Sequence, residues 1–495
     1  MTSEVDEQHL PGTAARSEGA VDGAVGASAP PKVLHLTAAE RSDRGRAARG
    51  EAPRPSHASL DLAPGRDPVG LVDADTPQRV QDLVPIRYGR MLVSPFTFYR
   101  GAAAIMAHDL AATPRSKLDV QLCGDAHLSN FGGFASPERD LVFDLNDFDE
   151  THRGPFEWDL KRLAASFEIA GRDRGFADAE RQAAVLAVVR AYREAMRGFA
   201  EMRNLDVWYS RLDATQLVAQ LREQSDAKAA KRIARGAAKA QTKDSMKAFA
   251  KLTHEVDGER RIVSDPPLVV PIEELMAEDD ARDATQEIRE QIRLYRRTLQ
   301  RDRRELLEEF RFVHLARKVV GVGSVGTRCW IALFLGRDDS DPLFLQVKEA
   351  GPSVLEPVLG KATFKNHGQR VVEGQRLMQA SSDIFLGWLR SKAGLDGQPR
   401  DYYVRQLWDW KTSFDLETIL PDGLVIYAQI CGWTLARAHA CSGDRIAIAS
   451  YLGRKDTFDR ALADFAVAYA DLNERDYQTL LNAARSGRIP VKEGR

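Results

Sequence analysis

The sequence feature that most constrains the fold is the stretch from Gly124 to Glu150. It begins G-D-A-H-L-S-N-F-G and ends L-V-F-D-L-N-D-F-D-E. Its alternating apolar residues predict a buried strand that delivers the acids after it to a cleft. Carboxylates and an asparagine carbonyl are hard oxygen ligands that suit Mg²⁺. A surface turn followed by an acidic edge is the plainer interpretation, because Gly-Asp is a common turn signal.

The acids of this stretch would need partners if they lie beside apolar strands, because burying an unpaired charge is costly. Asp125 lies in the Gly-Asp turn, and Asn130 follows it. A group of carboxylates closes the stretch, namely Asp144, Asp147, Asp149 and Glu150. The density of acids favours a functional site over a surface turn.

Composition excludes several classes of protein. The 495 residues are 43% hydrophobic and 29% charged, which is typical of globular proteins, and the net charge of −2 gives no field for nucleic acid or membrane. The four cysteines lie far apart in the sequence, so we expect neither disulfides nor a zinc site. No apolar run reaches membrane-spanning length, and the acidic, polar N-terminus does not resemble a signal peptide. We therefore expect a cytoplasmic protein with no membrane partner.

Two segments are polar enough to raise other expectations. Residues 1–80 contain few large apolar residues, so we expect a mostly disordered tail, with a short helix over Thr37 to Arg49 as an option.

Residues 227–251 carry a stripe of lysines and arginines at helical spacing, which is compatible with phosphate or nucleic-acid contact. No aromatic residues interleave with this stripe, so a solvated helix face is the preferred interpretation and nucleic acid is not expected as a partner.

A second motif lies in the sequence V-V-G-V-G-S-V-G-T-R-C-W-I-A-L-F-L. Gly321, Gly323 and Gly326, with Ser324 between them, form a G-x-G-x-x-G pattern flanked by two runs of β-forming residues. A dinucleotide-binding fingerprint requires a strand, a turn and then a helix. A strand–loop–strand pattern is instead expected of a glycine loop that covers nucleotide phosphates with its N–H groups. A structural glycine-rich hairpin is the alternative.

Lys348 is the single lysine in the apolar run P-L-F-L-Q-V-K-E-A, which predicts a strand. A lysine in a buried strand needs a counter-charge, and Glu373 lies at the centre of the next predicted helix. A lysine that binds phosphates and is held by a helix glutamate is the arrangement used by protein kinases. The alternative is an edge-strand lysine whose ammonium reaches solvent.

Arg100 ends the aromatic and basic sequence R-Y-G-R-M-L-V-S-P-F-T-F-Y-R. Its guanidinium suits either a phosphate or one of the acids downstream, since both accept its forked hydrogen bonds. The sequence leaves these two options open.

On these motifs the chain resembles DUF2252, a family of uncharacterised bacterial proteins, over roughly residues 85–490. The motifs also resemble those of kinase-like aminoglycoside and choline phosphotransferases. By that resemblance, Asp125 corresponds to the catalytic aspartate, and Asn130 and Asp147 to the metal ligands of the H-G-D-x-H-x-x-N and I-D-[FW] motifs. Asp144 is the rival of Asp147 for the last role. Asp159, in W-D-L-K-R-L-A, corresponds to a structural brace.

The order of the motifs departs from this pattern. The catalytic and metal motifs precede the glycine loop and Lys348, whereas they follow them in the phosphotransferases. The helix that normally enters the catalytic loop resembles L-A-R-A-H-A (Leu435 to Ala440), far downstream. Cys123 also replaces the residue, often histidine, that precedes Gly-Asp. The inverted order is compatible with a circular permutation, which domains tolerate because their termini lie at the surface.

The resemblance implies an α+β, protein-kinase-like two-lobed fold, circularly permuted, with helical insertions. We expect a catalytic part of the large lobe over residues 81–202, a helical insertion over 203–315, a small nucleotide-binding lobe over 316–412 and the helical remainder of the large lobe over 413–495. The expected function is transfer of phosphate from ATP, with Mg²⁺, to a hydroxyl of a small molecule or a protein. In this interpretation Gly321, Gly323, Ser324, Gly326, Lys348 and Glu373 bind the nucleotide.

Two other functions remain open at the level of the sequence. One is a non-catalytic nucleotide-binding module related to pseudokinases. The other is a metal-dependent phosphoesterase in which Asp125 and His127 form a D-x-H metal pair. The phosphoesterase would need further histidine and aspartate ligands at metal-binding spacing, and no second motif of that kind is present.

Overall fold

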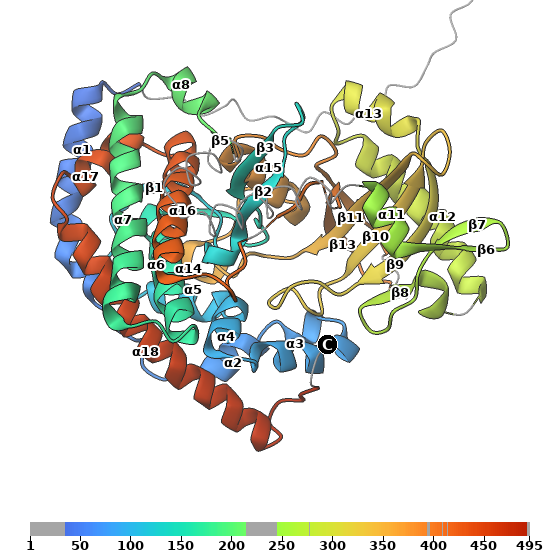
Figure 1. Ribbon diagram of the computed structural model, residues 1–495, viewed down its shortest axis with the longest axis horizontal. Coiled ribbons are helices and arrows are strands. Elements are labelled where there is room, and N and C mark those ends of the chain that lie inside the picture. Colours follow the sequence, from blue (N-terminus) through green and yellow to red (C-terminus); the bar gives the residue numbers. More distant parts are fainter. Residues whose placement is uncertain are drawn as a thin grey trace, which may run out of the picture. The chain divides into compact units, whose positions relative to one another are not determined.

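A computed structural model describes residues 35–213, 245–276, 278–393, 397–407, 409–412 and 414–492. The chain divides into two units, Met1–Thr37 and Ala38–Arg495, and the elements below belong to the second. Helices and several separate antiparallel sheets make up this unit (Figure 1), so the α+β class predicted from the sequence is confirmed. Among the described residues, every helix is too short or too polar to cross a bilayer.

The largest sheet has six strands in the order β12-β13-β11-β10-β9-β8, and all its neighbours are antiparallel. The strands are β8 (Val269–Pro271), β9 (Arg311–Lys318), β10 (Cys329–Leu335), β11 (Pro342–Ala350), β12 (Gly387–Ser391) and β13 (Arg400–Gln406). Apolar and aromatic residues dominate β10 and β11, as expected for strands whose two faces are both covered. The register pairs Cys329 with Lys348, which fixes the position of the lysine in the sheet.

Helices pack against both faces of this sheet. On one face α12 (Glu278–Arg296) contacts a core that includes Phe334 and Leu345. On the other face α11 (Ser245–Leu252) contacts Ile331 and Phe344. Because side chains alternate along a strand, Lys348 lies on the same face as Phe344, away from α12.

The remainder of the unit is mainly helical. Its long helices are α6 (Phe156–Asp173), α7 (Asp178–Glu201), α16 (Pro421–Ser442) and α18 (Thr457–Arg485). They enclose the largest hydrophobic core together with two small sheets, β1 (Asp119–Leu122) with β4 (His152–Pro155), and β2 (Phe131–Ala135) with β3 (Leu141–Leu145) and β5 (Leu212–Asp213). Every residue of α6 from Phe156 to Gly171 is buried, so this helix is the centre of the helical part.

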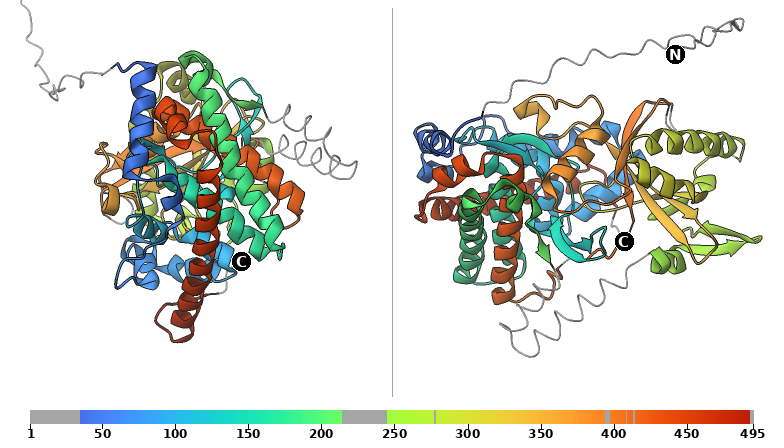
Figure 2. Two further views of the ribbon diagram at one scale, coloured as in Figure 1. Left: turned by 90° about the vertical axis from the view of Figure 1, so that its left-hand side faces the viewer. Right: turned by 90° about the horizontal axis from the view of Figure 1, so that it is seen from above.

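The prediction of a mostly disordered tail over residues 1–80 is wrong for residues 38–80, and residues 1–34 lie outside the described ranges. Helix α1 (Ala38–Glu51) packs along α17 (Arg445–Leu452), as the views in Figures 1 and 2 show. A Cβ atom on Gly45 would lie 2.0 Å from the Ala447 carbonyl oxygen, so glycine permits this close contact. Arginines also hold the segment in place: Arg41 Nε donates to Asp444 Oδ1 at 2.8 Å.

The segment predicted as a helical insertion, residues 203–315, is not purely helical. It contains α8 (Asn204–Tyr209), α11, α12 and α13 (Arg301–Glu308), but also the hairpin of β6 (Thr253–Val256) and β7 (Glu259–Ile262). Strand β8 and the start of β9 come from this segment as well, so the large sheet begins before residue 316. Most of the basic stripe at 227–251 lies outside the described residues, apart from its last part on α11.

Candidate active site

The centre of the candidate site is an ion pair between segments that lie 199 residues apart in the sequence. Lys348 on β11 donates from Nζ to Asp149 Oδ2 at 2.6 Å. The hydroxyl of Tyr403 on β13 donates to the other oxygen of Asp149, also at 2.6 Å. The Lys348 side chain is 3% exposed, whereas that of Asp149 is 27% exposed. Strand β11 and the acidic loop of Asp147 to Glu150 therefore meet at this ion pair. Water reaches the pair from the side of Asp149.

The charges of this pair determine the protonation of its neighbours. Burial favours a neutral amine, but Asp149, Tyr403 and Asp147 together raise the pKa of Lys348 well above its usual value. Burial also opposes ionisation of Asp149, yet Lys348 and Tyr403 hold the pKa of its carboxyl group below the usual value. Asp147 lacks such a direct partner, and burial followed by repulsion from Asp149 raises the pKa of Asp147.

Arg405 on β13 places a second cation beside the acids. Its Nη1 donates to the Asn146 carbonyl oxygen at 3.1 Å, and its Nε donates to Gln346 Oε1 at 3.0 Å. The residues Asp125, Asp147, Asp149, Lys348 and Arg405, whose charges act on one another, are called the charged cluster below.

Glu373 does not hold Lys348, so that prediction is wrong. Glu373 lies on α15 (His367–Met378) and pairs with Arg376 at 3.5 Å. The face of α15 toward the acidic loop carries Arg370 instead, which donates to the backbone carbonyl oxygens of Asp149 and Thr151 at 2.8 and 2.6 Å. Residues three positions apart on a helix differ by about 60° in direction, which is enough to turn Glu373 away. The counter-charge of Lys348 comes from the acidic loop, not from the helix.

The rival metal ligands Asp144 and Asp147 have different surroundings. Asp144, on β3, is 2% exposed and accepts hydrogen bonds from the Leu145 and Ala380 N–H groups, both at 2.8 Å. Asp147 accepts one weak bond, from the Asp149 N–H to Oδ1 at 3.3 Å. Within the described residues Asp147 Oδ2 has no hydrogen-bond partner. Asp147 therefore has an oxygen to offer a metal, and Asp144 is engaged by the backbone.

Asp125 is positioned by a tight backbone turn. Gly124 has φ +83°, and a Cβ atom there would lie 2.2 Å from the Glu150 carbonyl oxygen, so only glycine fits this contact with the acidic loop. Asp159 on α6 accepts from the N–H groups of Cys123 and Gly124 at 2.7 and 3.0 Å, which is the bracing role expected from the sequence. The carboxylate of Asp159 thereby fixes the backbone that carries Asp125.

The Asp125 carboxylate is held by a residue that the sequence did not indicate. Arg162 on α6 donates from Nη2 to Asp125 Oδ1 at 2.7 Å, and its guanidinium lies 4.0 Å from the centre of the Tyr99 ring. The Asp125 side chain is 21% exposed, so it remains accessible while Arg162 is buried. Arg162 belongs to the motif W-D-L-K-R-L-A, but the sequence suggested a role only for Asp159 in that motif.

His127 is a structural residue of the same turn. Its Nδ1 accepts from the Ser129 N–H at 3.2 Å, so the ring proton lies on Nε2, which is 3.8 Å from Asp125 Oδ2. Burial, then the cations Arg100 and Arg162, lower the pKa of His127 well below its usual value. His127 is thus neutral, and its Nδ1 is already used by the backbone.

The orientation of Asn130 is fixed by one hydrogen bond. Its Nδ2 donates to the Asp125 carbonyl oxygen at 2.8 Å. Because the amide nitrogen is used in this way, the amide oxygen of Asn130 is left as an acceptor. The Asn130 carbonyl oxygen accepts from the Asn146 N–H at 2.9 Å, which ties the turn of Asp125 to Asn130 to the residue before Asp147. Asn130 and Asp147 are therefore joined through adjacent backbone.

The glycine motif forms the turn of an antiparallel hairpin between β9 and β10, so the predicted strand–loop–strand pattern is confirmed. Gly321 and Gly326 have φ values of +70° and +93°, which glycine adopts without strain. Ser324 Oγ donates to the Val320 carbonyl oxygen at 3.0 Å, so this hydroxyl stabilises the loop itself.

The segment before Asp125 holds this loop in place. Arg90, on α3 (Val84–Met91), donates to the Gly321 carbonyl oxygen at 2.7 Å, and Arg79 donates to that of Val325 at 2.5 Å. A Cβ atom on Gly323 would lie 3.3 Å from the Arg100 carbonyl oxygen, so the middle of the loop packs on this backbone. The glycine loop therefore approaches the segment that leads to the Asp125 turn.

The helix that contains L-A-R-A-H-A, α16, packs beside the strand that leads into the Asp125 turn. Helix α16 contacts β1, and Ser442 Oγ accepts from the Gln121 N–H at 3.2 Å. His439 on the same helix reaches Asp159 Oδ2 at 3.3 Å. The end of α16 is thus beside the strand that enters the Asp125 turn, although far from it in sequence.

The residues present suit a magnesium ion that is shared with a phosphate ligand. Asn130 offers an amide oxygen and Asp147 a carboxylate oxygen, both hard donors. Among the residues that the structure describes, no group of three or more His, Cys, Asp or Glu side chains could hold a metal by itself. Mg²⁺ commonly binds through one or two carboxylates together with substrate phosphates, so this donor set fits Mg²⁺ with a nucleotide better than Mg²⁺ alone.

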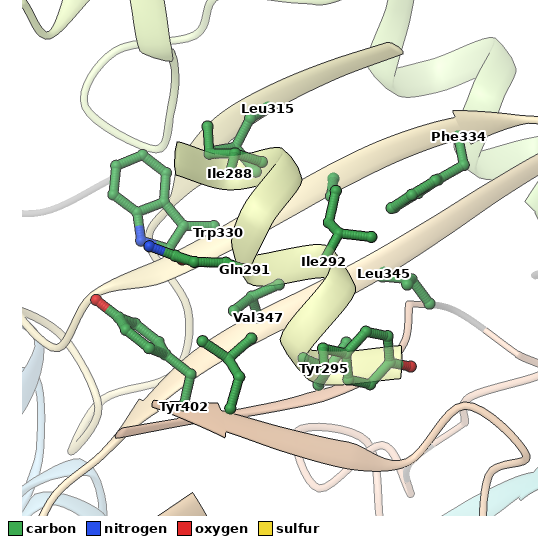
Figure 3. Close-up of a pocket in the computed structure, with 13 residues that line it drawn as sticks. Ile288, Gln291, Ile292, Tyr295, Leu315, Trp330, Phe334, Leu345, Val347 and Tyr402 are labelled. Atoms are coloured by element: carbon green, nitrogen blue, oxygen red, sulfur yellow. The ribbon is translucent and has the colours of Figure 1, made fainter. Parts of the chain in front are cut away.

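One cavity in the sheet is unrelated to this chemistry. It measures about 60 Å³ and lies between α12 and the sheet, lined by apolar side chains such as Ile292, Trp330 and Val347 (Figure 3). Val347 points into it, so Lys348, the next residue on β11, faces the opposite side of the sheet. The cavity belongs to the packing of α12.

Comparison with known proteins identifies a family without extending the function. No curated protein and no solved structure matches the chain. The sequence profile described as "Uncharacterized protein conserved in bacteria (DUF2252)" matches residues 79–483. Since this match spans well over half of the chain, the protein belongs to the DUF2252 family.

Proposed function

We propose that the protein is an ATP- and Mg²⁺-dependent phosphotransferase of protein-kinase-like, circularly permuted fold. Its acceptor is a hydroxyl group of a small molecule or a protein. The observation that carries the proposal is the Lys348–Asp149 ion pair, which joins the sheet of the glycine loop to the loop of Asp147. A glycine-loop hairpin, a lysine on the next strand and then a helix follow one another here in the order used by protein kinases.

The proposal assigns roles to Lys348, the glycine loop and three residues of the acidic stretch. Lys348 binds the α- and β-phosphates, and the glycine loop covers them with its N–H groups. Asn130 and Asp147 would hold Mg²⁺, which neutralises charge on the phosphates. Asp125, kept in place by Arg162, orients the acceptor hydroxyl and takes its proton.

The transfer balances with these groups. A bond forms between the acceptor oxygen and the γ-phosphorus while the bond from that phosphorus to the β,γ-bridging oxygen breaks. The electron pair of the broken bond leaves with ADP, and the proton of the acceptor goes to the Asp125 carboxylate. Catalysis then consists mainly of positioning and charge neutralisation.

The permuted fold is supported by the position of α16. In an unpermuted chain, the helix that contains His439 would lead directly into the strand before the catalytic aspartate. Ser442 and Gln121 are hydrogen-bonded at 3.2 Å, so a short connection there would restore the common order.

Nothing specific favours the phosphoesterase. Its D-x-H pair would need His127 as a metal ligand, but His127 Nδ1 accepts from the Ser129 N–H. The non-catalytic nucleotide-binding module differs from our proposal only in the chemical step, so measurement of phosphate transfer separates the two.

The test combines binding with transfer. Mg²⁺ with ATP should raise the melting temperature, since a ligand at 100 times its Kd adds about 2.7 kcal/mol to stability. Asp125→Asn should leave this shift in place while lowering transfer of labelled γ-phosphate about 10²- to 10⁴-fold. An unshifted melting curve at millimolar Mg-ATP would refute nucleotide binding. A wild-type protein that binds Mg-ATP but transfers no phosphate to water or to any acceptor would instead identify the non-catalytic module.

A further inference from the structure

The backbone that carries Arg100 is rigidly fixed. Arg100 lies in the last turn of α4 (Pro95–Gly101), which begins with a capping box between Ser94 and Thr97. The preceding Tyr99 donates its hydroxyl to the Arg162 carbonyl oxygen at 2.7 Å and accepts at its own carbonyl from Arg162 Nη2 at 2.8 Å. The direction in which the Arg100 side chain leaves the helix is therefore set by the same residue that holds Asp125.

Arg100 lies between the two parts of the candidate site. Its backbone is the surface on which Gly323 of the glycine loop packs. Its guanidinium acts electrostatically on Asp125 and contributes to the low pKa of His127, so the charge faces the catalytic turn. It is not a direct partner of Asp125, whose Oδ1 is bound by Arg162.

The Arg100 guanidinium has no partner in the described part of the chain. Its Nε is buried without a hydrogen bond, and neither its Nη atoms nor its Nε take part in an ion pair there. Arg370 and Arg437 also have a buried, unpartnered Nε, but both donate from their Nη atoms to backbone carbonyl oxygens. A buried guanidinium nitrogen without a partner is costly, and the Nη atoms are not among the buried atoms, so they remain open to an anionic ligand.

We propose that Arg100 donates to the terminal phosphate of a bound nucleoside triphosphate, as a fixed cation between the glycine loop and Asp125. This inference rests on the proposed phosphotransferase function. A planar guanidinium matches two phosphate oxygens at once, which an ammonium group does not. Lys348 binds the α- and β-phosphates, which remain in ADP. The chain would thus provide a separate cation, Arg100, for the γ-phosphate that is transferred.

The experiment measures affinity for ADP and for a non-hydrolysable ATP analogue, both with Mg²⁺, by calorimetry on the full chain. The wild type should prefer the triphosphate. Arg100→Gln should weaken binding of the triphosphate about 10- to 100-fold, the worth of a charge-assisted hydrogen bond, and leave ADP affinity unchanged. Arg100→Lys should recover part of the preference, because it restores charge without the fork. If Arg100→Gln does not fold, Arg100→Lys alone tests the inference, because it should show a reduced preference for the triphosphate over ADP.

Arg90→Ala is the matched control, because Arg90 contacts the same loop through the Gly321 carbonyl oxygen. Its effect should be equal for the two nucleotides. An Arg100 variant that keeps the full preference for the triphosphate would overturn the inference, as would a wild type that binds both nucleotides equally well. A wild type that binds neither nucleotide would refute the proposed function itself, independently of any variant.

Discussion

Two buried charge centres in this molecule differ in how completely their polar atoms are satisfied. In the first, Arg66 lies between Asp109 of α5 (Ala103–Leu110) and Asp476 of α18. Its three guanidinium nitrogens donate to all four carboxylate oxygens at 2.5 to 2.9 Å. Tyr469 adds a further donor to Asp109 at 3.1 Å. Every charge in this centre has a partner.

The second centre, the charged cluster with its neighbours, is incomplete. Asp147 Oδ2 and the guanidinium of Arg100 lack partners within the described residues, and the Asn130 amide oxygen is left as an acceptor. The two centres are comparably rich in charge, so charge density alone does not distinguish them. Under the proposed function, the open polar atoms of the second centre are the ones that a bound nucleotide and Mg²⁺ would satisfy.

The largest expected effect tests the saturated centre. Arg66→Met leaves Asp109 and Asp476 buried without a counter-charge, so the free energy of unfolding should fall by about 3–5 kcal/mol. Urea unfolding measures it. The control is Arg488→Ala, which removes an exposed ion pair with Asp67, the residue after Arg66. It should lower the free energy of unfolding by less than about 1 kcal/mol. A folded Arg66→Met protein with normal stability but no Mg-ATP shift would reverse the roles that the comparison gives to the two centres.

The next largest effect is expected from a comparison of Asp147 with Asp144, two carboxylates of the stretch from Gly124 to Glu150. Asp147→Asn removes the carboxylate charge from the unsatisfied position and should weaken Mg-ATP about 10- to 100-fold in calorimetry. Asp144→Asn should leave that affinity unchanged and lower stability by about 1–3 kcal/mol, because its new amide NH₂ would face a backbone N–H group. Mg²⁺ without nucleotide should leave the melting temperature unchanged in the wild type and in both variants. Loss of nucleotide affinity in Asp144→Asn alone would make Asp144 the metal ligand.

The sequence predicted those parts of the site that depend on local pattern. The apolar runs located the strands of Asp144 and Lys348, and the glycine spacing located the hairpin loop. It did not predict the partner of Lys348, because that depends on the phase of α15, which presents Arg370 and not Glu373 to the acidic loop. The phase of a short helix is set by packing, which no local pattern specifies.

The sequence also failed to predict that residues 38–80 are folded, for a related reason. The segment up to residue 80 has few large apolar residues, and composition alone favours disorder. Several of its contacts are made by arginines with partners about 400 residues away, such as Arg66 with Asp476 and Arg41 with Asp444. Burial of such ion pairs depends on the whole fold, so the sequence of the segment carries no sign of it.

The smallest expected effect concerns Glu150, at the border of the charged cluster. Glu150 Oε2 accepts from the Val354 N–H at 2.7 Å, but burial, opposed by that hydrogen bond, raises the pKa of the carboxyl group to about 7. The folded state thus binds the proton more tightly than the unfolded state, whose pKa is near 4.5. Stability from this group is fully present below pH 4.5 and is lost as the pH rises through 7.

Glu150→Gln keeps an oxygen for the Val354 N–H and removes the titration. Its urea midpoint should match that of the wild type near pH 4.5 and exceed it at pH 8, by a free energy on the order of 1 kcal/mol, since Glu150 is only partly buried and water screens its charge. Glu138→Gln should behave oppositely, because the Ser136 hydroxyl lowers the pKa of Glu138 and its ionised form stabilises the fold at neutral pH. Equal pH profiles for Glu150→Gln and the wild type would show that Glu150 is ionised in the folded protein without cost to stability.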